Sequence, residues 1–173
     1  MQTKKLTQTA LMTAVICILS PLTLPIGPVP VSLANLAVCL CVYLLGTKYG
    51  AISYFIYYLL GCMGLPVFSG FGGGLGKALG PTGGFLLGFF VLILIGGIFI
   101  KHFKNIYMHF FGLLLGDAAV YLIGVPWFAA VAHTDMYSAF LTACAPFILI
   151  DIIKIFFVTI LGSEITKRIK PVS

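Results

Sequence analysis

One stretch decides the fold class: Ala145-Pro146-Phe147-Ile148-Leu149-Ile150-Asp151-Ile152-Ile153-Lys154-Ile155-Phe156-Phe157-Val158-Thr159-Ile160-Leu161-Gly162. Apart from Asp151 and Lys154, it has the composition of a membrane-spanning helix. A charge at bilayer depth costs about 2.5–3.5 kcal/mol on insertion scales, so two charges in one span need a reason. Their i, i+3 spacing puts both on one helix face, which must point into a bundle because lipid does not solvate it. Two interpretations follow: a self-paired structural ion pair, or polar contacts for a solute bound within the membrane.

The composition extends this conclusion to the whole chain. The 173 residues are 61% hydrophobic and 8% charged, with a mean hydropathy of +1.15. We therefore predict an all-α integral membrane protein, since helices satisfy their own backbone hydrogen bonds in lipid. The length accommodates a bundle of about six spans of roughly 20 residues each, which form a single transmembrane domain over residues 1–173.

Motifs that the sequence lacks, and the placement of its charges, argue against several function classes. There is no GxxxxGK[ST] loop, so the chain does not couple to ATP by itself in the usual way. The serines and histidines show no nucleophile–base pattern, and we predict that the chain is not an enzyme. The five cysteines lie in apolar runs without a CxxC pair, which predicts neither a disulfide nor a metal site. The net charge of +6 resides in segments between spans, which argues against nucleic acid as a partner.

The predicted spans alternate with short loops. They cover residues 6–22, 33–46, 49–63, 85–100 and 106–123, with a sixth that follows Tyr137 and ends near Gly162. Loops are predicted at residues 22–32, where prolines forbid a helix, and at 125–134, which contains Trp127. With the N-terminus inside, eight Lys and Arg residues are cytoplasmic and only Lys77 is outside. Both termini are then cytoplasmic, and the proline, glycine and Trp127 loops share the outer face.

The glycine-rich loop at residues 64–84 is the most distinctive one. It is too apolar for a solvated linker and too rich in glycine for a continuous helix. Irregular backbone of this kind persists in a membrane only where protein or a cavity surrounds it. We interpret the loop as a lid over a binding cavity, with a re-entrant structural turn as the alternative. As a lid, it would supply Phe68 and Phe71 as apolar walls.

Four further residues have more than one possible role. Ala10 and Ala14 form a small-xxx-small pair that suits internal packing or docking of a partner subunit. Asn35 is a candidate for a helix cap, a helix–helix hydrogen bond or a ligand contact. Asp117, a lone carboxylate within a span, is a functional candidate or is bonded to a nearby amide such as Asn35.

Four motifs in order resemble the BioY family of biotin-specific substrate-binding (S) components of energy-coupling-factor (ECF) vitamin transporters. They are Gly64-Leu65-Pro66-Val67-Phe68-Ser69-Gly70, Gly80-Pro81-Thr82-Gly83-Gly84-Phe85-Leu86-Leu87-Gly88-Phe89, Gly124-Val125-Pro126-Trp127 and Asp151-Ile152-Ile153-Lys154. The resemblance implies a six-helix protein of the bacterial plasma membrane that captures biotin with high affinity at its outer side. It implies as partners a transmembrane coupling protein (EcfT-like) and two cytoplasmic ATPases. It also implies that Ala10 and Ala14 dock on the coupling protein.

The chemistry of biotin suggests roles for the candidate site residues. Asp151 is expected to accept from the ureido N–H groups, and Lys154 to bind the ureido oxygen or the carboxylate. Lys77 is a second candidate for the carboxylate. The expected walls of the ring and tail are Phe68, Phe71, Phe85 and Trp127. No cofactor and no metal are expected, and the alternatives are an S component for another small vitamin or a stand-alone biotin transporter.

Overall fold

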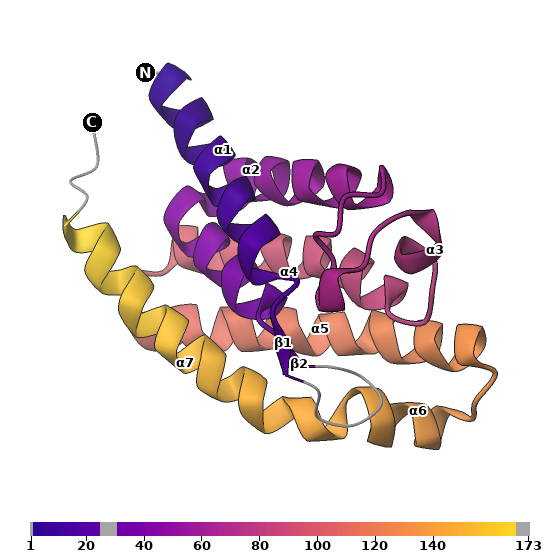
Figure 1. Cartoon of the computed structure of the whole chain (residues 1–173). Coiled ribbons are helices and arrows are strands. Elements are labelled where there is room, and N and C mark those ends of the chain that lie inside the picture. Colours follow the sequence, from indigo (N-terminus) through magenta and orange to yellow (C-terminus); the bar gives the residue numbers. More distant parts are fainter. Residues whose placement is uncertain (1, 25–30, 169–173) are drawn as a thin grey trace.

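The computed structural model describes residues 2–24 and 31–168. Three of the prolines in the predicted proline loop, Pro25, Pro28 and Pro30, lie outside the described residues. Within these ranges the chain is a bundle of α-helices with one small antiparallel strand pair (Figure 1). The elements are α1 (Gln2–Leu19), β1 (Thr23–Leu24), β2 (Val31–Ser32), α2 (Ala34–Cys62), a 3-10 turn (Ser69–Phe71), α3 (Leu75–Ala78), α4 (Gly83–His102), α5 (Ile106–Ala132), α6 (Met136–Ala143) and α7 (Ala145–Arg168).

The predicted all-helical membrane fold is confirmed. Four helices are long and apolar enough to cross a membrane: α2, α4, α5 and α7. The predicted spans at 33–46 and 49–63 are the two arms of α2, which meet at Gly46. Gly46 has a left-handed φ of 72° and ψ of −176°, so the helix turns a corner there, as Figure 1 shows. The predicted turn near Lys48 is therefore a bend between two joined helices.

The prediction of a loop at residues 125–134 is wrong. Helix α5 continues through Pro126 and Trp127 to Ala132. Proline removes one backbone donor, but a membrane helix tolerates this where neighbouring helices pack around it. The helix ends at His133, which adopts a left-handed φ of 53°, and Thr134 N then donates to Ala129 O at 3.1 Å.

Glycines bring α4 and α5 into close contact. A Cβ at Gly88 would lie 2.9 Å from Val120 Cα, and one at Gly116 would lie 3.0 Å from Leu92 Cα. Gly84 of α4 likewise leaves space for Trp127 of α5, and Gly124 of α5 leaves space for Phe85 of α4. Small residues allow backbones to approach in membranes, where dispersion contacts drive helix association. This contact fixes the axis of α5, the helix that carries Asp117.

The two ends of the bundle differ in structure. The start of α1 and the end of α7 lie on one side, while the strand pair, α3 and α6 lie towards the opposite side (Figure 1). Lys5 Nζ and Lys48 Nζ both lie over the Tyr49 ring, at 5.3 and 5.9 Å from its centroid. Basic residues from α1 and from the corner of α2 therefore share one end of the molecule.

We expect Gly88→Ala to lower the stability of the bundle, because its new Cβ meets the backbone of Val120. Overpacking of this kind costs about 1–3 kcal/mol. The matched control is Gly76→Ala, where a Cβ meets nothing within 4 Å. Thermal unfolding in detergent should show a lower midpoint for Gly88→Ala only, and equal midpoints would contradict the close contact.

Candidate ligand-binding site

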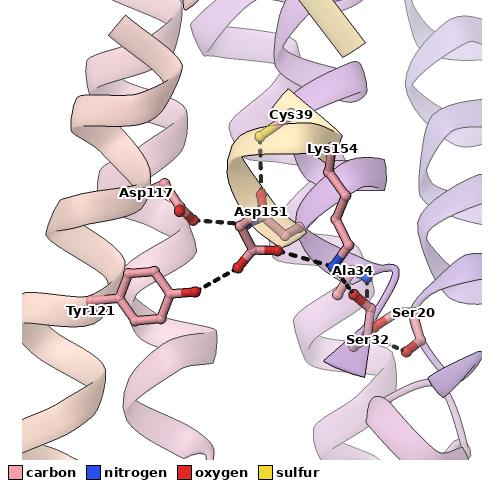
Figure 2. Close-up of polar contacts among 9 residues, drawn as sticks. Ser20, Ser32, Ala34, Cys39, Asp117, Tyr121, Asp151 and Lys154 are labelled. Atoms are coloured by element: carbon pink, nitrogen blue, oxygen red, sulfur yellow. Dashed lines mark hydrogen bonds and ion pairs between the residues drawn. The ribbon is translucent and has the colours of Figure 1, made fainter. Parts of the chain in front are cut away.

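The two charges of α7 form a buried ion pair. Asp151 Oδ1 accepts from Lys154 Nζ at 3.0 Å, and the two residues are 7% and 9% exposed. The lysine also donates to the backbone oxygen of Ser32 at 2.8 Å, which links α7 to the end of β2 (Figure 2). The expected contact between the two charged side chains is thus confirmed. Neither charge is bare, as burial in an apolar bundle requires.

Tyr121 provides a second hydrogen bond to the carboxylate of Asp151. Its hydroxyl, presented by α5, donates to Asp151 Oδ2 at 2.6 Å (Figure 2). Sequence reasoning missed this residue because a tyrosine in an apolar span usually belongs to an interface belt or to the core. One signal was available: Tyr121 follows Asp117 by four residues, so both lie on the same face of the helix.

Asp117 and Asn35 form a second buried polar pair. Asn35 Nδ2 donates to Asp117 Oδ1 at 2.7 Å, and Cys39 Sγ donates to Asn35 Oδ1 at 3.2 Å. The predicted bond between Asp117 and Asn35 is therefore confirmed, and it joins α2 to α5. Among the described residues, no buried side-chain nitrogen or oxygen lacks a hydrogen-bond partner.

These groups line one cavity between the helices and the loops at their ends. About 760 Å³ of space within it is not filled by atoms, part of it open to the outside. The sequence-predicted residues that line it are Asn35, Phe68, Lys77, Phe85, Asp151 and Lys154. The lining also includes Ser20, Ser32, Ala34, Ser69, Thr82, Leu86, Phe89, Asp117, Val120, Tyr121, Ala143 and Phe147.

The glycine-rich loop contributes two of the predicted residues in different ways. Phe68 is 1% exposed and packs edge-on against Tyr57, with its ring over Gly61, where no larger side chain would fit. Lys77, on the short helix α3, is half-buried at the cavity, with its stem against Gly72. The loop therefore carries an apolar wall and a cation to the same space.

Two predicted wall residues lie elsewhere. Phe71 has a left-handed φ of 57° and is 65% exposed, because the 3-10 turn directs its side chain outward. Trp127 does not line the cavity. Its Nε1 donates to Gly80 O at 2.9 Å, and its side chain packs on Gly84. Trp127 thus holds the end of the glycine-rich loop against α5.

The small-residue pair of α1 is on the outside of the bundle. Ala10 and Ala14 are both exposed, with Leu11 and Ile18 also exposed, while Met12 and Ile16 are buried on the opposite face. The internal-packing interpretation of this pair is therefore wrong. The exposed face remains available to a partner.

The site offers a defined set of hydrogen-bonding groups. Asp151 has one bond to each oxygen, which leaves one further acceptor position on each. Lys154 uses two of its three N–H donors, and one is left for a ligand. Around them the walls are apolar. In residues 2–24 and 31–168, no cluster of His, Cys, Asp and Glu is suited to a metal ion.

The chain is similar to known transport proteins along its length. Biotin transporter BioY2 of Lactococcus lactis subsp. cremoris (strain MG1363) is 37% identical over 166 residues, covering 95% of this chain and 91% of that protein. Biotin transporter BioY of Thermotoga maritima (strain ATCC 43589 / DSM 3109 / JCM 10099 / NBRC 100826 / MSB8) is 32% identical over 164 residues, covering 95% and 96%. Both relatives are transporters, in agreement with the prediction that this chain is not an enzyme.

A solved structure and a family model lead to the same assignment. The crystal structure of an S-component for biotin from an ECF-type ABC transporter matches with a TM-score of 0.89 and 32% identity. The match covers 96% of this chain and 92% of that one. Together with the apolar spans, these relatives identify a multi-pass protein of the cell membrane. The model of the BioY family matches residues 1–171, and the chain therefore belongs to the BioY family.

Proposed function

We propose that this chain is the biotin-binding S component of an ECF-type vitamin importer. The observation that carries the proposal is the paired set Asp151, Lys154 and Tyr121 at one side of an apolar-walled cavity. The names of the relatives supply the candidate ligand, and the residues of this site fit its chemistry. Asp151, Lys154 and Lys77 would be the polar contacts, with Phe68 and Phe85 as walls.

The ureido head of biotin matches the free positions of the site. It has two N–H donors and one carbonyl acceptor on a rigid ring. Asp151 has two free acceptor positions, and Lys154 has one free donor beside them. A charged acceptor and a charged donor make stronger hydrogen bonds than neutral groups do. We therefore assign the ureido ring to this pair.

The other end of biotin is a carboxylate on an apolar chain. Lys77 is the cation of the glycine-rich loop and lines the same cavity as Asp151. Phe68, Phe85 and Phe89 provide apolar surface for the thioether ring and the chain. Our proposal thus assigns the carboxylate to Lys77 and gives the glycine-rich loop the role of a lid.

The orientation in the membrane follows from the charges. We propose six crossings: α1, the two arms of α2, α4, α5 and α7, with both termini in the cytoplasm. The shared environment of Lys5 and Lys48 at Tyr49 supports a basic, cytoplasmic end. The lid and the cavity mouth would then face outward, and biotin would enter from that side.

Coupling of release to ATP requires partners, since residues 1–173 contain no GxxxxGK[ST] nucleotide-binding loop. We propose a transmembrane coupling protein and two cytoplasmic ATPases. The exposed pair Ala10 and Ala14 on α1 supports a close helix–helix contact with the coupling protein.

Titration calorimetry with biotin on the ligand-free protein tests the proposal. We expect Asp151→Asn and Lys154→Met each to weaken binding about 30-fold or more, because breaking a buried charge pair costs 2–5 kcal/mol. Tyr121→Phe removes only one bond and should weaken binding about five- to tenfold.

Lys167→Met is the matched control, because Lys167 pairs with Glu164 at the exposed end of α7. Its affinity should equal that of the wild type. Each variant must also be monodisperse, since a stranded charge can unfold the bundle. The absence of binding by a folded, ligand-free wild type would refute biotin as the ligand.

The lid assignment is tested by Trp127→Phe, which keeps an aromatic ring but removes the donor to Gly80 O. Loss of about 1 kcal/mol should open the loop about fivefold more often. Limited trypsin digestion should then cleave faster after Lys77, with cleavage after Lys48 as the internal control. Unchanged cleavage at Lys77 would show that this bond does not hold the loop.

The docking assignment is tested by Ala14→Trp, with Ala130→Trp on the exposed face of α5 as control. The large side chain should block close approach of a partner helix to α1. We expect Ala14→Trp to lose co-purification of the coupling protein and ATPases while keeping biotin affinity. Retained co-purification would place the partner on another face.

A further inference from the structure

A second cavity lies between α5, α6 and α7, behind the ligand cavity. It is lined almost wholly by apolar side chains and holds about 970 Å³ of space not filled by atoms, part of it open. Its lining residues are Leu114, Asp117, Ala118, Tyr121, Leu122, Val125, Pro126, Met136, Phe140, Cys144, Ile148 and Ile152. We call this the α5–α7 groove.

The groove opens towards the membrane. At its rim, Leu122 is 76% exposed, Met136 is 57% exposed and Ile148 is 39% exposed. Leu122 and Ile148 belong to the apolar helices α5 and α7, which are long enough to span a bilayer. The groove is therefore continuous with the lipid-facing surface of the protein, where the neighbouring molecules are acyl chains.

The two polar residues of the lining each bond a side chain that lies outside the groove. Tyr121 points to Asp151 in Figure 2, and Asp117 Oδ1 accepts from Asn35. Both residues also line the ligand cavity. The rest of the groove is formed by the ring of Tyr121 and by apolar side chains, a surface that water does not wet well.

The length of the groove suits one hydrocarbon chain. Along α5 the lining runs from Leu114 to Pro126, which is roughly 18 Å at 1.5 Å per residue. One leaflet of a bilayer contributes about half of a hydrocarbon core that is roughly 30 Å thick. A single acyl chain therefore extends over the depth that the groove spans.

We propose that the α5–α7 groove binds one phospholipid acyl chain, which packs against the Tyr121 ring and closes the site on its lipid side. The acyl chain would cover apolar surface that the described side chains leave open in the groove. Because Tyr121 bonds Asp151 on its other edge, the lipid forms the outer layer of the wall behind the ligand site.

Photo-crosslinking, with and without added biotin, tests the proposal. The protein is placed in nanodiscs of phosphatidylcholine that carries a diazirine at the middle of one acyl chain. After irradiation, the adducts are located by mass spectrometry. We expect adducts concentrated on groove residues such as Met136 and Cys144, above those on exposed Phe157 and Leu161 of α7.

Two matched variants show whether the groove itself binds the chain. Ala118→Phe fills the groove with a ring from an exposed position, and Ala130→Phe makes the same change on α5 outside it. We expect groove adducts to fall at least fivefold in Ala118→Phe only.

Three outcomes would overturn the proposal. Adducts spread evenly over the exposed apolar residues would mean that the groove has no preference for lipid. Groove adducts that biotin removes would assign the groove to the ligand. Absent groove adducts in a protein that self-associates would assign it to a second copy of this chain.

Discussion

The structure depends on the burial of Asp151 and Lys154 within an apolar helix. Each charge needs partners, because an unpaired ion in this environment costs several kcal/mol. Those partners come from three places: from the other charge on α7, from Tyr121 on α5 and from the backbone of Ser32 at the end of β2. One ion pair therefore specifies how α7, α5 and the strand pair sit relative to one another.

The glycines of α4 and α5 complement this arrangement. Gly88 and Gly116 let the two helices approach closely enough for backbone to meet side chain. That contact holds α5 at one side, and the bond from Asn35 to Asp117 holds it at another. These contacts hold α5 in place. Tyr121, four residues after Asp117, is consequently directed at Asp151. The Tyr121 hydroxyl is thus positioned by the close packing of α5 against α4 and by the polar contacts of α5 with α2 and α7.

The membrane class, the ion pair of α7 and the bond between Asn35 and Asp117 could be predicted from the sequence. The membrane class follows from the composition. The two polar contacts follow from one rule: a polar group in a span needs a nearby partner. The extent of α5 could not be predicted, because proline at position 126 normally ends a helix and only the packing of neighbours allows it to continue.

The positions of two aromatic residues, Phe71 and Trp127, were also beyond sequence reasoning. Phe68 and Phe71 lie three residues apart in one loop, yet one is buried and the other is exposed. The difference comes from a left-handed turn at Gly70 and Phe71 that composition does not reveal. Trp127 was expected as a wall, but it does not line the cavity, and its Nε1 donates to Gly80 O.

The charged groups of this site already have protein partners, so the site selects ligands that keep these hydrogen bonds and add new ones. Asp151 and Lys154 are satisfied by protein groups in this structure, so neither charge depends on a ligand for a partner. A ligand with a matching urea adds bonds at the free positions and leaves the existing ones in place. An apolar molecule of the same shape would remove water from those positions and offer nothing in return. Sites that hydrogen-bond their ligand discriminate against such analogues by roughly 10⁴-fold or more. The apolar walls thus select ligands by shape, and the ion pair selects among these ligands by hydrogen bonding.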